Sequence, residues 1–192
     1  IKDVPWKTND RLALHFVLNT QSRTAQVARI ELCIPGTRVP HHVVMVRLQN
    51  GKLTATMTDY HKSGEEVATL MLDKALSYPN AHQITVTIKN NEIGLKRDGD
   101  TGQSVRRTLS NRLEENYHVN FLFGGSLKYS ARSFYGCLRY VRLELGAQNF
   151  KDPRISSKNV ERGCVKGNQI TLYITNSLFF CGNDTMLHFM RV

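Results

Sequence analysis

The feature that most constrains the fold of this chain is an alternation of apolar and polar residues on both sides of an Asn-Gly pair. Apolar residues occupy every second position before and after the pair: Val44, Val46, Leu48, Leu53, Ala55 and Met57. A period of two places these side chains on one face of a β-hairpin. Asn50-Gly51 supplies residues that tolerate the positive φ angles of a type I′ turn. The sequence therefore predicts a hairpin over 42–58 that covers a core on one side only.

A second hairpin and an earlier strand follow the same rule. Apolar residues again take alternate positions around a second turn, Asn90-Asn91: Ile84, Val86, Ile88, Ile93 and Leu95. The residues Leu12, Leu14 and Phe16 mark the earlier strand. Helical periodicity is scarce, so we expect an all-β sandwich or barrel of many short strands. The polar and basic segment 100–115 is predicted to be an exposed loop.

Length and charge set the broad class of protein. The 192 residues suffice for one sizeable core and only marginally for two domains. The net charge is +10, which favours polyanionic partners such as sulfated glycans, acidic glycoproteins, anionic lipid or nucleic acid. No run of about 18 apolar residues is present, so no membrane insertion is predicted.

The candidate binding residues are five basic side chains that follow the second hairpin closely. They are Lys96, Arg97, Arg106, Arg107 and Arg112. Arginine holds a sulfate or carboxylate group with two parallel donors, so loops at one end of a sandwich could gather these side chains into a polyanion site. The alternative is a scatter of solvated charges, and Asp98 and Asp100 would weaken the cluster.

The sequence offers no motif of catalysis or of metal binding. None of the seven histidines shows the i, i+4 helical spacing of a zinc site, and adjacent His41 and His42 would point to opposite faces if they lie in a strand. The carboxylate pair Glu65-Glu66 is adjacent in sequence, so it does not supply the separated carboxylates of a glycoside hydrolase. We therefore expect no catalytic residue and no metal site.

Four cysteines, Cys33, Cys137, Cys164 and Cys181, allow three pairings into two disulfide bonds. The alternative is that Cys33 and Cys181 are buried thiols. A basic nucleic-acid-binding protein is a further possibility, but it would require reduced cysteines, and aromatic residues in a base-stacking pattern are few. Asn183-Asp184-Thr185 is an N-glycosylation sequon, which agrees with a secreted protein.

Three segments in the second half of the chain resemble the closing strands of laminin G-like domains. They are 121–126, which contains Gly124-Gly125; 134–143, which contains Gly136-Cys137; and 160–164, which ends in Gly163-Cys164. The strand over 11–18 and the hairpins over 42–57 and 82–99 match the order of earlier segments in that family. The resemblance implies a jelly-roll-like sandwich of two antiparallel sheets and a Cys137–Cys164 disulfide bond. We also expect Cys33–Cys181, because a C-terminal strand would need an anchor.

The chain departs from the family pattern at its calcium site and at its ends. Calcium prefers oxygen ligands, yet His41-His42 holds the place of an acidic ligand and the segment 118–120 holds the place of a second ligand. We therefore expect no bound calcium and no other cofactor. Residues 1–170 are predicted to form the laminin G-like domain, and residues 171–192 either complete it with a C-terminal strand or begin a following domain.

The resemblance implies an extracellular adhesion or matrix-binding module without catalytic activity. Together with the charge, it predicts a sulfated glycosaminoglycan of the heparan sulfate type or an acidic glycoprotein receptor at the cell surface as the partner. The alternatives are a protein–protein interaction module that binds no glycan and the nucleic-acid-binding protein considered above. We expect the parent protein to be secreted, or to carry this domain outside the cell membrane.

Overall fold

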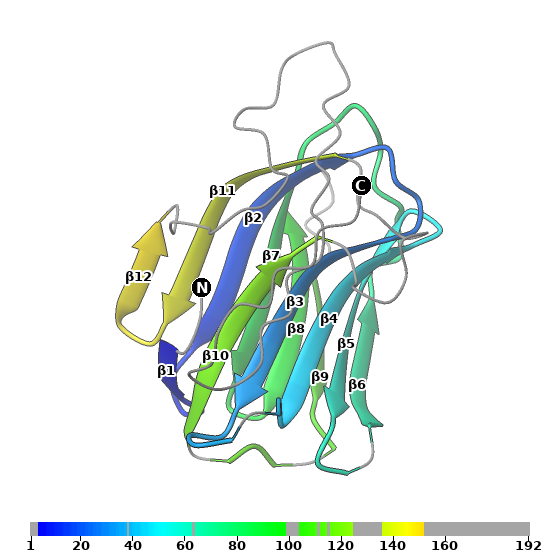
Figure 1. Cartoon of the computed structure of the whole chain (residues 1–192). Coiled ribbons are helices and arrows are strands. Elements are labelled where there is room, and N and C mark those ends of the chain that lie inside the picture. The colour runs from blue at the N-terminus through cyan, green and yellow to red at the C-terminus, as the bar shows by residue number, and fades with distance from the viewer. Residues whose placement is uncertain are drawn as a thin grey trace, which may run out of the picture.

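The computed structural model describes residues 4–37, 39–62, 64–98, 104–110, 112–114, 116–124 and 136–151. These residues form two six-stranded antiparallel sheets packed face to face (Figure 1). No helix occurs among them, so none is long and apolar enough to cross a membrane. The predicted all-β sandwich of two antiparallel sheets is confirmed.

The first sheet has the order β1-β10-β3-β4-β5-β6 and the second has the order β12-β11-β2-β7-β8-β9. The strands of the first sheet are β1 (Val4–Lys7), β10 (Asn116–Phe123), β3 (Ala25–Cys33), β4 (His42–Gln49), β5 (Lys52–Asp59) and β6 (Glu65–Met71). Those of the second sheet are β12 (Gln148–Lys151), β11 (Gly136–Leu145), β2 (Leu12–Thr20), β7 (His82–Lys89), β8 (Glu92–Asp98) and β9 (Ser104–Thr108).

Both predicted hairpins form, and both close through residues with positive φ. Asn50 and Gly51 have φ values of 53° and 79° between β4 and β5, and Asn90 and Asn91 have 48° and 62° between β7 and β8. Two successive positive φ angles are the requirement of a type I′ turn, whose twist matches that of the flanking strands. The turns therefore fix the register that puts the apolar face of each hairpin inward.

The core lies between the two sheets and is built from the alternating apolar residues. Its members in the two hairpins are fully or almost fully buried: Val44, Val46, Leu48, Leu53, Ala55, Met57, Ile84, Val86, Ile88, Ile93 and Leu95. The polar residues between them face outward, as expected for sheets that are solvated on one side. Trp6 of the edge strand β1 also joins the core and packs on Tyr117 of β10, with ring centroids 6.2 Å apart.

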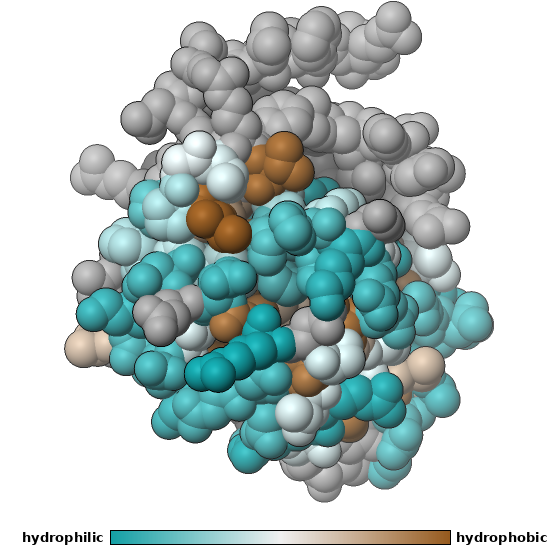
Figure 2. Space-filling model, turned by 90° about the horizontal axis from the view of Figure 1, so that it is seen from below, coloured by the Kyte–Doolittle hydropathy of each residue, from teal (hydrophilic) through white to brown (hydrophobic). Residues whose placement is uncertain are grey.

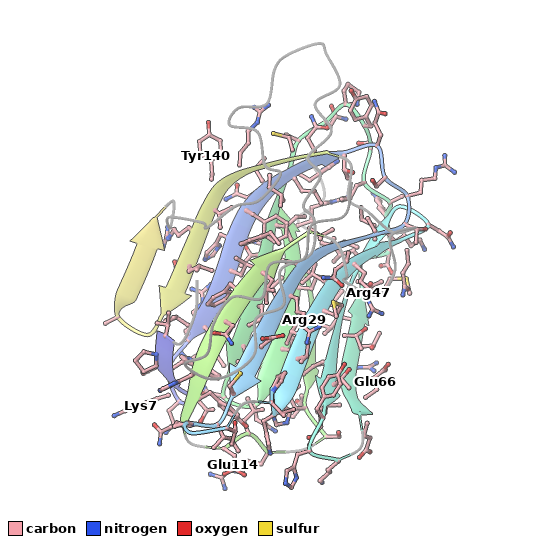
Figure 3. The ribbon with its side chains drawn as sticks, viewed as in Figure 1. Lys7, Arg29, Arg47, Glu66, Glu114 and Tyr140 are labelled. Carbon is pink, nitrogen blue, oxygen red and sulfur yellow. The ribbon has the colours of Figure 1, made fainter. Side chains whose placement is uncertain are left out.

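Two strands differ from a simple reading of the sequence. The segment predicted as an exposed loop over 100–115 contains β9, which pairs with β8 at the edge of the second sheet. Strand β11 carries a bulge between Arg139 and Arg142, where Tyr140 has a φ of 51°. A bulge turns a side chain away from its neighbours, and Tyr140 is 75% exposed and projects from the sheet (Figure 3).

Candidate functional site

The basic residues predicted from the sequence lie around the β8–β9 edge of the second sheet, but they do not share one face. Lys96 is exposed on the outer face of β8. Arg106 stands opposite Gly94 in the β8–β9 register and is exposed on the same face. Arg107 stands opposite the buried Ile93, so it leaves the edge strand on the other side while remaining exposed.

Arg97 is not part of an exposed surface, which corrects the prediction for this residue. It continues the inward series of Ile93 and Leu95 along β8 and is only 7% exposed. Its guanidinium Nη1 donates a hydrogen bond of 3.2 Å to the carbonyl oxygen of Ala75. Arg97 therefore ties the β6–β7 connection to the sheet and cannot contact a large ligand in the way that Lys96 and Arg106 can.

Arg112 reaches this region through the β7–β8 turn. The backbone N–H of Leu109 donates to the carbonyl of Asn91 at 2.9 Å, and the N–H of Leu113 donates to Asn91 Oδ1 at 3.3 Å. These bonds fasten the segment around Arg112 against the turn, and Arg112 itself is exposed. The structure thus brings Arg112 to the turn end of the surface that contains Arg106.

A shallow pocket of about 390 Å³ lies on the outer face of β7, β8 and β9. Its lining residues are Arg11, Thr87, Lys89, Asn90, Glu92, Ile93, Gly94 and Arg106. Three of these side chains are cationic and one is anionic, so the pocket favours an anionic ligand. We call the exposed residues Arg11, Lys89, Lys96 and Arg106 together the basic face.

Gly94 forms the floor of the pocket because it is the position of β8 between Glu92 and Lys96 on the outer face. A Cβ atom at Gly94 would lie 2.5 Å from Thr87 Oγ1 and 3.6 Å from Arg106 Cγ. Any side chain there would fill the space between the two strands. Arg11 and Lys89 were missed from the sequence because Arg11 directly precedes β2 and Lys89 ends β7, and only the sheet register brings them together.

One acidic residue, Glu144, borders the basic face on β11. Glu144 Oε2 lies 3.5 Å from Arg11 Nη1, and its other oxygen contacts Arg142 and lies 3.4 Å from His15 Nε2. Burial alone would raise the pKa of Glu144, but His15 and the two arginines outweigh it and hold that pKa below its ordinary value. Burial lowers the pKa of His15, although the neighbouring Glu144 acts to raise it. The permanent positive charge beside Glu144 therefore comes from Arg11 and Arg142.

The histidines at positions 41 and 42 do not point apart. The prediction of opposite faces was conditional on both residues lying in a strand, and that condition is not met, because β4 begins at His42 and His41 precedes it. Their rings pack 4.8 Å apart, and the two Nδ1 atoms are 3.1 Å from each other. Burial, more than the nearby imidazoles, lowers the pKa of His42 to about 4, although Asp59 opposes the shift. The side chains of two adjacent residues can meet at the start of a strand, because the residue that precedes the strand need not follow the alternation of sides within it.

Cys33 at the end of β3 and Cys137 in β11 are both disulfide-bonded. The other two cysteines, Cys164 and Cys181, lie outside the described residues, so the pairings Cys137–Cys164 and Cys33–Cys181 remain predictions. The sequon residue Asn183 and the C-terminal segment 171–192 also lie outside them. Of the segment that replaces a calcium ligand, Asn120 is buried and donates to Glu31 Oε2 at 3.4 Å; the expected absence of calcium remains a prediction.

The sequence matches one known family model. The family model described as laminin G domain matches residues 34–145, which is more than half of the chain. No curated protein matches the sequence.

Solved structures with the same architecture include laminins and an enzyme. The LG1-3 region of the laminin alpha2 chain superposes with a TM-score of 0.52 at 15% identity, over 72% of this chain and 27% of that one. Domains LG4-5 of the mouse laminin alpha1 chain give 0.53 at 15% identity, over 79% and 40%. An alginate lyase gives 0.52 at 12% identity, over 74% and 65%. The chain spans about a quarter to two fifths of the laminin structures it matches.

Proposed function

Because this chain belongs to the laminin G domain family, we propose that it is an extracellular binding module, and not an enzyme, that holds a sulfated or acidic glycan on the basic face. The family is one of adhesion and binding modules. The glycan, the extracellular location and the lack of catalysis are our proposals. The alginate lyase fold match shows that the same sandwich also occurs in an enzyme, so fold alone does not decide between binding and catalysis.

The observation that carries the proposal is the composition of the pocket above Gly94. Arg11, Lys89 and Arg106 line it with one acidic residue, Glu92, and Glu144 pairs with Arg11 at its border. A guanidinium can grip a sulfate or carboxylate group through two parallel hydrogen bonds. The Thr87 hydroxyl and the Asn90 amide line the same pocket and can hydrogen-bond sugar hydroxyls. A shallow, open, polar site of this kind suits a linear polyanion.

The disulfide bonds support an extracellular site of action over the nucleic-acid alternative. We expect Cys33 and Cys137 to be disulfide-bonded in the native protein, as they are in the structure, and disulfides persist in secreted and cell-surface proteins but are rare in the cytosol and nucleus. Nucleic acid therefore would not be the polyanion that this module meets.

Heparin-affinity chromatography with a matched pair of variants tests the proposal. Arg106→Glu places a negative charge in the pocket, whereas Arg47→Glu makes the same change on β4 of the other sheet (Figure 3). We expect R106E to elute at clearly lower salt than R47E, with Tm values of both close to that of the unchanged chain. Salt itself should release the chain, because screening shortens electrostatic reach from about 10 Å at 0.1 M to about 3 Å at 1 M.

Equal elution of the two variants and the unchanged chain would reject the basic face as the site. A second candidate function, a protein–protein interaction module, would then be favoured by one specific feature. Tyr140 is 75% exposed on the β11 bulge beside the exposed Arg139, and exposed Tyr and Arg are enriched among interface hot spots. Cell binding that survives heparin-lyase treatment but is lost in Tyr140→Ala would support that function.

A further inference from the structure

Histidine rings and a carboxylate gather at the end of the first sheet where β4 begins and β5 ends, which is the lower end in Figure 1. His42 and Asp59 are direct cross-strand partners. His41 precedes β4, and His61 follows β5 in the adjoining turn. This cluster uses no residue of the basic face, which lies on the other sheet.

The cluster brings three potential ligand atoms close together. One ligand atom each from His41, His42 and Asp59 lies within 4.8 Å of the others. The two imidazoles approach at 3.1 Å between Nδ1 atoms, and His42 Nε2 lies 3.6 Å from Asp59 Oδ2. Ligand bonds to zinc are about 2.0–2.2 Å long, which separates the ligand atoms of a tetrahedral site by slightly more than 3 Å. The distance from His42 Nε2 to Asp59 Oδ2 is near that requirement. The 3.1 Å approach of His41 is to the other nitrogen of His42, so the His41 ring would have to turn to bring its ligand atom to the same ion, within the 4.8 Å that encloses the set.

The carboxylate is held in place by backbone donors. Asp59 Oδ1 accepts hydrogen bonds from the N–H groups of His61 at 2.9 Å and Lys62 at 3.2 Å. Its other oxygen, Oδ2, is thereby turned toward His42. The turn after β5 therefore fixes the carboxylate in position before any ligand arrives, and a preorganised donor loses little conformational entropy on binding.

His42 is also held by its surroundings. Its side chain is 2% exposed, and its Nδ1 lies 3.2 Å from the hydroxyl of Tyr117, which accepts a hydrogen bond from the N–H of Glu114 at 3.0 Å. A metal-bound histidine usually donates its other ring N–H to an oxygen acceptor. The Tyr117 hydroxyl is placed to be that acceptor for His42 Nδ1–H.

The second observation that points to a ligand is the state of His42 Nε2. This atom is buried and has no hydrogen-bond partner among the residues that the structure describes. If Nε2 carries the proton, 3.6 Å is too long for a good hydrogen bond to Asp59. If Nδ1 carries the proton, the Nε2 lone pair faces an anionic oxygen across the same gap. When Nδ1 carries the proton, a cation between Nε2 and Oδ2 would attract both the lone pair and the anionic oxygen and would remove the repulsion between them.

We propose that His41, His42 and Asp59 bind a divalent transition-metal ion, with Zn²⁺ as the best match. Imidazole nitrogen is a ligand of zinc, copper and nickel, whereas calcium and magnesium take oxygen ligands. Two histidines and one carboxylate form one of the three-residue ligand sets found for zinc, with the fourth position open to water.

The ion can enter from the solvent side of the cluster. His41 is half-buried and His61 is exposed, and their rings lie 4.8 Å apart between centroids. Figure 2 views this end of the molecule and shows a mostly hydrophilic surface with separate hydrophobic patches. His61 is therefore the side chain that could take the fourth position in place of water.

The test is titration of the full, disulfide-intact chain with Zn²⁺ alone, followed by isothermal calorimetry and thermal unfolding. We expect one ion per chain and a Tm that rises with Zn²⁺ and returns with chelator, because a ligand that binds only the native state stabilises it. Co²⁺ in place of Zn²⁺ should give the visible absorption of a tetrahedral nitrogen and oxygen site. Calcium at the same concentration should leave the Tm unchanged.

Variants make the assignment specific. His42→Gln, Asp59→Asn and the more exposed His41→Gln should each weaken Zn²⁺ binding by about 100-fold or more, since even outer-shell changes cost about 10–100-fold. His82→Gln removes a histidine from the other sheet and should bind like the unchanged chain. His41→Gln keeps the test decisive if His42→Gln fails to fold.

Three outcomes would overturn the proposal. They are no Tm shift with Zn²⁺, an undiminished shift in His41→Gln and Asp59→Asn, and an equal shift with calcium. The first would leave the cluster as a hydrogen-bonded structural group, and the second would place any zinc at another histidine. The third would indicate a hard-cation site.

Discussion

Arg106 faces Gly94 across the β8–β9 ladder, so a flexible cation stands beside the one position on the outer face of β8 that has no side chain. The pocket exists because of this pairing. A side chain at position 94 would occupy the space into which a sulfate or carboxylate group must enter to reach Arg106.

Gly94→Ala should lower stability and heparin retention together. Its methyl group would lie 2.5 Å from Thr87 Oγ1, and overpacking of this kind costs about 1–3 kcal/mol of unfolding free energy. Thr87→Ala in the same chain should restore most of the stability by removing the clash. Urea unfolding of the two single variants and the double variant measures the coupling. Additive losses would show that the methyl group meets no obstacle at Thr87.

Lys96→Met and Arg97→Met should have opposite effects although the residues are neighbours. Lys96 is exposed on the basic face, so its loss should reduce heparin retention with little change in stability. Arg97 is buried and bonded to the Ala75 carbonyl, so its loss should cost about 1–3 kcal/mol of unfolding free energy and leave retention unchanged. Heparin elution and urea unfolding of the two variants give the comparison. Weak retention of R97M with normal stability would contradict the inward position.

Glu144 should make the stability depend on pH at the acid end. Its pKa is lowered in the folded state, so the unfolded chain binds more protons as the pH falls below about 4.5. Stability from Glu144 is therefore present above its unfolded pKa and is lost as pH falls through its folded pKa. Glu144→Gln should be less stable than the unchanged chain at pH 7, and the difference should shrink in acid.

His15 also contributes to the pH dependence, in a higher window, because burial lowers its pKa while Glu144 opposes that shift. Its contribution is present above about pH 6.5 and is lost as pH falls through the folded pKa. Because Glu144→Gln also removes the charge that raises the pKa of His15, urea midpoints should be compared at pH 7, near pH 5 and near pH 3, which separates the histidine window from the carboxylate window. A stability difference that stays constant across this range would contradict the ionic role of Glu144.

The two turn asparagines should respond differently to glycine. Asn91 has positive φ, but its amide also donates to the Leu109 carbonyl and accepts from the Leu113 N–H. Asn91→Gly should therefore cost about 1–3 kcal/mol, from two hydrogen bonds of about 0.5–1.5 kcal/mol each. Asn50 at the other turn has positive φ and is exposed, so Asn50→Gly should change stability by less than about 0.5 kcal/mol. Equal losses of unfolding free energy in the two variants would show that the side-chain hydrogen bonds of Asn91 do not contribute to stability.

The disulfide pairings can be read directly by peptide mapping without reduction. We expect a peptide that joins Cys137 to Cys164 and another that joins Cys33 to Cys181. A peptide joining Cys33 to Cys164 would overturn both pairings at once. It would also remove the argument that the C-terminal segment is anchored through Cys181.

The hairpins could be predicted from the sequence because their information is local. Alternation with a period of two and a turn pair at 50–51 or 90–91 determine which face of each strand is buried. The same alternation extends from Ile93 and Leu95 to Arg97, so the inward position of Arg97 was available from the sequence. Strand β9 was missed because Ser104–Thr108 has almost no apolar residues to alternate.

The candidate sites depended on pairings between distant segments, and only one of these could have been found. His42 and Asp59 are equally far from the turn at 50–51, so the hairpin register places them opposite each other. Arg11 and Arg106, by contrast, meet at the pocket only because β2, β7, β8 and β9 are neighbours in that order. Strand order is set by packing of the whole sandwich, which no short sequence pattern records.

The position of β9 gives its arginines a role that does not depend on any ligand. Strand β9 is the last strand of its sheet, and the unpaired backbone groups of an edge strand can pair with another chain. Charged side chains such as Arg106 and Arg107 keep two such edges apart by repulsion. A bound polyanion would neutralise this repulsion, so occupancy of the basic face also makes the edge able to pair. A concentrated polyanion would then promote self-association of the chain through this edge. Replacing these arginines with neutral residues would lower solubility more than replacing them with acidic residues, which still repel one another.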